Sequence, residues 1–428
     1  MSEGTGSKTI LSLHSVGVVS GIAAGAWLGA AEAPTKLVTM GFSPFLISLG
    51  MVMGVFVARW TIPVALKGTS YIWADLREKP HLIVWGIVAG MLWAVANTLT
   101  VFAIRNVGLS VAFPLWNVNS LVGMFWGWLL FNELRGSGAK QRLIVLGGAT
   151  AIVFGACLLA YSTANHDSSV KREAAMLGIL AASGAALLWG TMYIPYRKAY
   201  ISGMNPLSFV TVFTVGELGT VFALAAIFDG GVANVFHSLE QAKPVLFWLF
   251  LGGFCWVIGD LFQQYAAKYI GISRGIPLSN TNQLWGLAWG ALVFGELAHM
   301  ADSQSLIVGG SLIMIAGATA ISFAEAPADE QRHWRLAMER ECARYGLDRE
   351  RVAAAVMGSD SARGPHAQRR WWELLVVAAA VSVFVWLGML AERPGMEFDT
   401  SWMLAIAAAS LALLAGAVVV LWKRTRFA

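Results

Sequence analysis

The chain has few charged residues and few cysteines. Charged residues make up 13% of its 428 residues, well below the roughly 25% of a soluble globular domain, which excludes an ordinary water-exposed fold. Its three cysteines have neither disulfide nor metal-ligand spacing. Its seven histidines are scattered, and no Ser-His-Asp set, metal cluster or phosphate-binding loop is discernible. We therefore predict no enzyme activity, no cofactor and no metal site.

Hydrophobic residues, by contrast, make up 57% of the chain, and the mean hydropathy is +0.63. Several apolar runs reach the roughly 20 residues that a helix needs to cross ~30 Å of hydrocarbon. These runs are continuous, whereas the strands of a membrane β-barrel alternate apolar and polar residues. The pattern predicts an all-α polytopic membrane protein. The net charge of +5 is explained better by membrane topology than by nucleic-acid binding.

The chain contains a duplicated unit, because the stretch 85–134 aligns without a gap with the stretch 248–297. The identities include rare residue types that composition alone does not bring into register. Among them are the pairs Gly90/Gly253, Trp93/Trp256, Pro114/Pro277, Asn117/Asn280, Asn119/Asn282 and Glu133/Glu296. Further matches, in a slightly shifted register, pair Gly29 with Gly190 and Gly54 with Gly216. The first helix therefore belongs to the repeat and is not a cleaved signal peptide.

Each repeat has five predicted helices. They span 11–31, 42–60, 81–104, 109–132 and 141–161 in the first repeat, and 175–196, 206–228, 245–267, 275–297 and 304–324 in the second. The predicted divisions are a first repeat over 1–162, a second over 163–324, a polar cytoplasmic linker over 325–370, and two further transmembrane helices within 371–428. We expect the linker to be solvated, with a pair of short helices as the alternative.

Five helices per repeat is an odd number, so the second repeat enters the membrane from the opposite side to the first. Such inverted repeats are typical of secondary transporters. With the N-terminus in the cytoplasm, most of the 30 Lys and Arg residues fall in cytoplasmic segments, as the positive-inside rule requires. We therefore expect both termini in the cytoplasm and few basic residues deep in the helices.

Two carboxylates, Asp260 and Glu217, fall inside predicted helices, where ionisable side chains are costly and are candidates for function. Their repeat counterparts are the neutral residues Asn97 and Val55, so the shared scaffold does not require the charges. We predict that Asp260, and after it Glu217, couples transport to protons. The alternative for each is a structural hydrogen bond to a neighbouring helix.

Uncharged amides form a second set of candidates. Pro114 and Pro277 are each followed by asparagine at +3 and +5, and a proline frees a helix carbonyl that a polar cavity can satisfy. The predicted substrate-binding amides are Asn97, Asn117, Asn119, Gln263, Asn280, Asn282 and Gln283. For any single asparagine the alternative is interhelical hydrogen bonding.

Two tryptophans complete the predicted site. Trp93 and Trp256 precede Asn97 and Asp260 by four residues, so each pair shares a helix face. Aromatic rings beside a few polar groups are typical of a ligand site and suit a sugar, although tryptophan is also frequent at membrane interfaces. Glu133, like its counterpart Glu296, is expected to have a structural role, such as capping a neighbouring helix.

The endings Phe131-Asn132-Glu133 and Phe294-Gly295-Glu296, on a 5+5 inverted repeat, resemble the EamA-like drug/metabolite transporter superfamily. The stretch LLWGTMYIPYRK at 187–198 looks like the Trp-Gly…Pro-Lys helix of its glucose/ribose porter and L-rhamnose–proton symporter branches. The resemblance covers about 11–324, and the chain departs from it by adding 325–428. It implies a secondary transporter of the plasma membrane with a central site between the repeats, and sugar–proton symport.

The predicted function is secondary active transport of a small polar solute, a sugar first of all, coupled to protons. One alternative is export of amino acids, nucleosides or other metabolites on the same fold. Another is a membrane sensor or scaffold that does not transport. The expected partners are the solute, protons and the lipid bilayer, with no nucleic acid. The two extra helices are expected to cover the bundle or to mediate homodimerisation.

Overall fold

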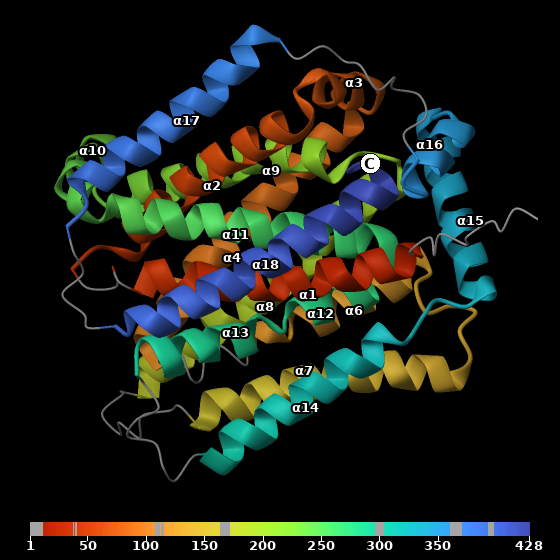
Figure 1. Cartoon of the computed structure of the whole chain (residues 1–428), viewed down its shortest axis with the longest axis horizontal. Coiled ribbons are helices and arrows are strands. Elements are labelled where there is room, and N and C mark those ends of the chain that lie inside the picture. Colours follow the sequence, from red (N-terminus) through yellow and green to blue (C-terminus); the bar gives the residue numbers. More distant parts are fainter. Residues whose placement is uncertain are drawn as a thin grey trace, which may run out of the picture.

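The structure is a computed structural model that describes residues 12–36, 38, 41–107, 112, 115–162, 172–295, 304–359, 370–392 and 398–428. Every regular element within these ranges is a helix (Figure 1). Ten of the described helices are long and apolar enough to cross a membrane. Their outer surfaces expose large apolar side chains, such as Val84, Leu143 and Ile227, which a lipid environment accommodates. The predicted all-α polytopic membrane fold is confirmed.

The first half of the bundle contains four long helices. These are α1 (Leu13–Lys36), α2 (Pro44–Lys67), α4 (His81–Val107) and α7 (Ala139–Ser162), with the shorter α3 (Ser70–Glu78) and α6 (Asn119–Phe131). Ser43 caps α2 by accepting from the backbone N–H of Leu46, and Pro44 occupies its first turn, a position that needs no N–H donor. The long helices extend several residues beyond the predicted ends, and α3 is absent from the sequence prediction.

The second half follows the same order of elements. Its long helices are α8 (Arg172–Ile201), α9 (Pro206–Phe228), α11 (Lys243–Ile270) and α14 (Gln304–Ser322), and its short ones are α10 (Val232–Gln241), α12 (Ile272–Ser279), α13 (Asn282–Ala288) and the π-helix η1 (Trp289–Val293). Asn205 caps α9 by accepting from the backbone N–H of Leu207, as Ser43 caps α2. The two halves therefore begin their second long helix in the same way.

The fourth predicted helix of the second half is broken. The sequence predicts one helix over 275–297, but α12 ends at Ser279, α13 starts at Asn282, and the chain continues as η1. Pro277 lacks a backbone N–H, which leaves the carbonyl of Ser273 without its helical donor inside α12. In the first half α6 begins only at Asn119, and Pro114 lies outside the described residues. Broken helices of this kind line the sites of many transporters.

Glycines allow the two halves to interlock closely. A Cβ at Gly90 of α4 would clash with the carbonyl oxygen of Phe213 on α9, and a Cβ at Gly253 of α11 would clash with that of Met51 on α2. Since Gly90 and Gly253 are repeat counterparts, the α4–α9 and α2–α11 crossings are equivalent. The helices α7 and α14 pair at Gly155 and other glycines and lie together at the bottom of Figure 1.

Residues 328–356 form two helices, α15 (Ala328–Tyr345) and α16 (Arg349–Val356), rather than the favoured solvated linker. They lie across one end of the bundle, opposite the end that carries α10 (Figure 1); this is called the α15 end below. Glu330 and Cys342 are buried there, 0% and 2% exposed. Mixed charge concealed this burial, because two acidic residues of α15, Glu330 and Glu341, form ion pairs with Arg274 and Lys198 of the bundle.

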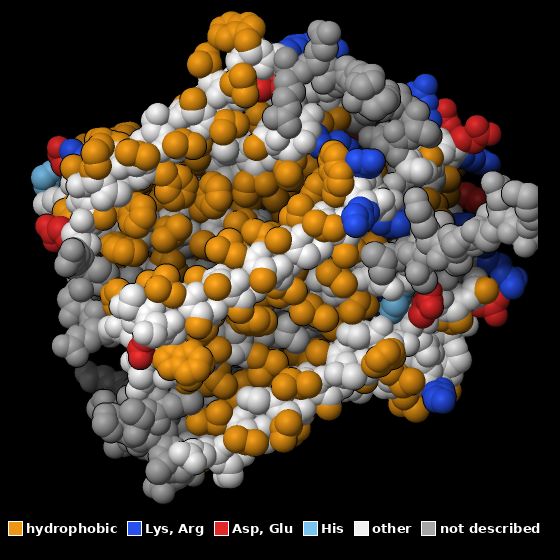
Figure 2. Space-filling view, in the orientation of Figure 1, with side chains coloured by type: hydrophobic (Ala, Val, Ile, Leu, Met, Phe, Trp, Pro, Cys, Tyr) orange, Lys and Arg blue, Asp and Glu red, His pale blue; other side chains and the backbone are white. Residues whose placement is uncertain are grey.

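The last two helices, α17 (Trp371–Leu390) and α18 (Thr400–Thr425), pack on one flank of the bundle. Thr69 donates to Glu373 of α17 from its backbone N–H (2.8 Å) and its hydroxyl (2.7 Å). Trp27 of α1 donates to the carbonyl of Ser410 on α18 (3.2 Å). Figure 2 shows hydrophobic side chains over this flank, with Lys and Arg gathered mainly toward the α15 end. In this structure the extra helices cover the bundle.

Candidate functional site

A buried group of three charges lies at the centre of the bundle. Nη2 of Arg59, on α2, is 2.8 Å from Oδ2 of Asp260 on α11 and 3.6 Å from Oε1 of Glu217 on α9. All three side chains are 0% exposed. The arginine comes from the first half and both carboxylates from the second, so the group lies where the halves meet. Both predicted coupling residues thus share one cation.

Asp260 and Glu217 are held differently. Asp260 also accepts hydrogen bonds from the Tyr196 hydroxyl (3.0 Å) and the Gln264 amide (2.6 Å), and Tyr200 donates to the other end of that amide. Neither carboxylate oxygen of Glu217 has a hydrogen-bond partner among the described residues. Asp260 is therefore the fixed member of the group and Glu217 the loosely held one.

Aromatic rings enclose the arginine. The guanidinium carbon of Arg59 lies 4.1 Å from the centroid of the Phe213 ring and 5.2 Å from that of Trp256. Trp256 in turn contacts Trp93, with 4.7 Å between the ring centroids. Such cation–π contacts stabilise a desolvated cation by about 2 kcal/mol. The structure thus brings both predicted tryptophans together and places one of them against the charge group.

The predicted asparagines meet at the two breaks in the helices. The Asn280 amide, in the α12–α13 break, donates to the Asn117 carbonyl (3.4 Å) and to Oδ1 of Asn119 (3.3 Å). Gln263 donates to the hydroxyl of Ser279 (2.7 Å). Gln263 follows Asp260 by three residues on α11, so it shares a helix face with the charge group. These bonds connect the amide cluster with the helix that carries Asp260.

Two predicted amides keep buried atoms without partners. Oδ1 of Asn282 and Nε2 of Gln283 have no hydrogen-bond partner among the described residues. Buried polar atoms are nearly always hydrogen-bonded, so an exception requires an explanation such as an absent ligand or water. Both residues lie in the first turn of α13, directly after the break. Unpaired donors and acceptors of this kind could bind the hydroxyl groups of a solute.

The contact that Asn97 makes is to a residue outside the charge group. It donates to the hydroxyl of Ser48 on α2 (2.9 Å). Its repeat counterpart Asp260 instead contacts Arg59. Asn97 therefore makes an interhelical hydrogen bond, which was the alternative stated for any single asparagine.

A second polar cluster closes the α15 end. Glu133, at the end of α6, accepts from the backbone N–H groups of Ile272 (3.1 Å) and Ser273 (2.8 Å). It also lies 2.9 Å from Nε of Arg197 on α8. The expected capping of a neighbouring helix is confirmed for Glu133, which binds the first turn of α12. Glu296 lies outside the described residues.

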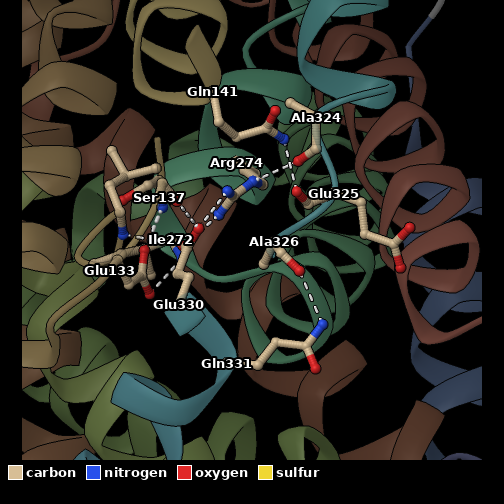
Figure 3. Close-up of polar contacts among 12 residues, drawn as sticks. Glu133, Ser137, Gln141, Ile272, Arg274, Ala324, Glu325, Ala326, Glu330 and Gln331 are labelled. Atoms are coloured by element: carbon tan, nitrogen blue, oxygen red, sulfur yellow. Dashed lines mark hydrogen bonds and ion pairs between the residues drawn. The ribbon is translucent and has the colours of Figure 1, made fainter. Parts of the chain in front are cut away.

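Arg274 and Glu330 form a fully buried ion pair in the same cluster (Figure 3). Two nitrogens of Arg274 bind the two oxygens of Glu330 at 2.7 and 2.8 Å, and its Nε binds the carbonyl of Ala324. Burial raises the pKa of Glu330, but hydrogen bonds from Arg274, Ser137 and Leu134 outweigh it and leave that pKa below its usual range. The pair ties α15 to α12.

Sequence reasoning missed Arg59 and Tyr196. The positive-inside count places Arg59 in a cytoplasmic segment, but the structure buries it inside α2. Eight residues separate it from the helix end at Lys67, a depth of about 12 Å by helical rise. Two intramembrane carboxylates also require a cation nearby, and that requirement could have identified Arg59.

Residues 176–323 match the model of the EamA-like transporter family. This stretch runs from α8 to α14 and includes Glu217, Asp260 and the α12–α13 break. The chain contains an EamA-like transporter domain. The resemblance to the drug/metabolite transporter superfamily is thereby confirmed over this stretch.

Two bacterial relatives each match more than half of the chain. A Streptococcus pyogenes serotype M6 protein named "Putative sugar uptake protein" is 22% identical over 284 residues, which are 65% of this chain and 89% of that protein. "Probable glucose uptake protein GlcU" of Staphylococcus aureus is 23% identical over 248 residues, 56% and 78% of the two chains. A crystal structure matches with a TM-score of 0.51 at 16% identity, covering 69% of this chain and 95% of that one, which supports the fold alone.

Proposed function

We propose that the protein is a secondary active transporter that moves a sugar together with protons across the plasma membrane. The observation that carries the proposal is the Arg59–Asp260–Glu217 group, in which one buried cation of the first half faces two carboxylates of the second. Charges in such a place are costly, and a fold keeps them where they serve transport. Both termini and the α15 end would face the cytoplasm.

Charge balance supports the proton coupling. One guanidinium balances one carboxylate, so ionising both leaves a net negative charge in a site without exposed side-chain surface. Burial disfavours an unpaired charge, and a single proton on either carboxylate removes it. Glu217, with its longer contact and no hydrogen-bond partner among the described residues, is the member that can turn away from Arg59. Glu217 would turn toward Arg59 when Asp260 takes up a proton, and away again when Asp260 releases it.

The uncharged groups at the charge group and at the α12–α13 break suit a neutral polyol. Trp93 and Trp256 would offer ring faces for C–H groups, and Oδ1 of Asn282 and Nε2 of Gln283 would offer an acceptor and a donor. Arg59 does not argue for a phosphorylated sugar, because its charge is already balanced by Asp260. The names of the streptococcal and staphylococcal relatives support the same solute class.

The buried ion pairs at the α15 end are consistent with a transporter that opens to one side of the membrane at a time. Glu133 and Glu330 tie α6, α8, α12 and α15 together there, which would close the cytoplasmic side of the bundle. Opening that side would require the buried pairs to separate or to move as one body.

Uptake into proteoliposomes tests the proposal. Purified protein is reconstituted, and a panel of radiolabelled neutral sugars is offered with and without an inward proton gradient. At least one sugar should accumulate, and only when the gradient is present. If no sugar is taken up, the sugar assignment is contradicted. If a sugar accumulates equally with and without the proton gradient, proton coupling is contradicted. Export of preloaded amino acids or nucleosides would favour the alternative instead.

A further inference from the structure

A basic hollow lined by tryptophans lies where α3 meets the start of α17. Its volume is about 490 Å³. The lining residues are Ser70, Trp73, Ala74, Arg77, Arg370 and Trp372. The hollow combines two cations and two aromatic rings from two segments that lie far apart in the sequence. None of these residues belongs to the proposed transport site.

The hollow lies at the level of the membrane surface. The α2 span ends at Lys67, three residues before Ser70, and the α17 span begins at Trp371. Trp73 and Trp371 are 46% and 74% exposed, and exposed tryptophans beside span ends mark the interface between hydrocarbon and headgroups. Lipid phosphates occupy this depth.

The two arginines lack anionic partners in the described part of the chain. Both are exposed, and neither is in an ion pair. Of the acidic groups near them, Glu78 faces Arg351 at 3.9 Å, and the buried Glu373 accepts from Thr69 and from the backbone N–H of Arg370. Asp75 is buried on the other side of α3, 3.0 Å from Lys79. The side chains of Arg77 and Arg370 therefore leave two positive charges at the hollow.

We propose that this hollow binds the headgroup of an anionic phospholipid. Arginine binds phosphate oxygens through paired N–H groups, and basic pockets beside transmembrane helices bind anionic headgroups. The phosphate would lie between Arg77 and Arg370, the Ser70 hydroxyl would donate to it, and the rings of Trp73 and Trp372 would flank the glycerol region.

The bound lipid would connect α17 to the bundle. This helix lies outside the repeated core and is joined to it near the hollow by the Glu373–Thr69 hydrogen bonds. A headgroup between α3 and α17 adds a second connection at the same place. Anionic lipid should therefore stabilise the full-length protein against thermal unfolding.

Native mass spectrometry and thermal unfolding of the detergent-purified full chain test the site. Three probes are added separately: phosphatidylglycerol, phosphatidylcholine and inorganic phosphate. Phosphatidylglycerol should remain bound and raise the midpoint of unfolding, and the other two should do neither. An equal effect of phosphatidylcholine, or the same stabilisation by inorganic phosphate, would overturn a site for an anionic lipid.

Variants locate the binding. Arg77→Gln combined with Arg370→Gln should weaken retention of phosphatidylglycerol about tenfold or more, a loss of roughly 1.4 kcal/mol. Arg142→Gln, an exposed arginine near the start of α7, is the matched control and should leave retention unchanged. Undiminished binding by the double variant, or an equal loss in the control, would overturn the assignment. Because binding is measured without transport, these outcomes are independent of the sugar uptake result.

Discussion

Asn97 of α4 and Asp260 of α11 occupy equivalent positions in the two repeats but meet different neighbours. Asn97 makes a single hydrogen bond to Ser48. Asp260 contacts Arg59, Tyr196 and Gln264. The crossings that position the two residues are the same, since Gly90 and Gly253 pack equally closely on α9 and α2. A duplicated scaffold thus carries a neutral interhelical contact at one position and a charged contact at its repeat counterpart.

The Arg59–Asp260–Glu217 group should lose stability when its charge balance is removed. Arg59→Gln leaves Asp260 and Glu217 buried without a cation, and breaking a buried pair in this way costs about 3–5 kcal/mol. Thermal unfolding of the purified variant should show this loss. The combined change Arg59→Met and Asp260→Leu should regain much of the stability but no coupled uptake. If Arg59→Gln is as stable as the wild type, the arginine does not balance the carboxylates.

At the α15 end, Glu330→Gln should lower stability at pH 7 by about 3 kcal/mol, because Arg274 loses its buried partner. The pKa of Glu330 is depressed in the fold, so its contribution is present above its ordinary pKa and is lost as pH falls through the folded value. The difference in midpoint between the two proteins should therefore shrink in acid below the ordinary pKa. The neighbouring Asp329→Asn, in an exposed pair with Arg332, should cost about 0–1 kcal/mol.

The equivalence of the two crossings can be tested with methyl groups. Gly90→Ala and Gly253→Ala each place a Cβ against a backbone carbonyl of the other half, and each should cost about 1–3 kcal/mol by overpacking. Gly219→Ala on α9 meets open space and serves as the control. Similar losses of stability in Gly90→Ala and Gly253→Ala would support equivalent crossings. A loss in only one of them would show that the α4–α9 and α2–α11 crossings differ.

The neutral counterpart should tolerate change. Asn97→Ala removes one uncharged hydrogen bond, which contributes about 0.5–1.5 kcal/mol, and the bond that Asn97 makes is to Ser48 rather than to the Arg59 group. Uptake by this variant should keep its dependence on the proton gradient. Loss of that dependence would show that Asn97 itself takes part in coupling.

Much of the bundle could be predicted from the sequence, because continuous apolar runs long enough to span the membrane form helices. The gapless repeat then identifies which helices of the two halves are equivalent. The break at Asn280 was not predicted, because the whole stretch 275–297 was assigned to one spanning helix, although the polar residues from Ser279 to Gln283 interrupt its apolar sequence. Arg59 was missed because basic residues near helix ends ordinarily lie at the membrane surface. The burial of Glu330 was missed because a mixed-charge segment gives no sign of its partner, Arg274, which lies on a different helix far away in the sequence.

Asp260→Asn is the most direct test, since it gives the second repeat the residue that the first already has. The variant is reconstituted beside the wild type, and two quantities are measured for a transported sugar: exchange across the membrane without a gradient, and accumulation driven by a proton gradient. Exchange should persist, because the amide cluster and tryptophans remain, while driven accumulation disappears. Accumulation that still follows the proton gradient would contradict the coupling role of Asp260.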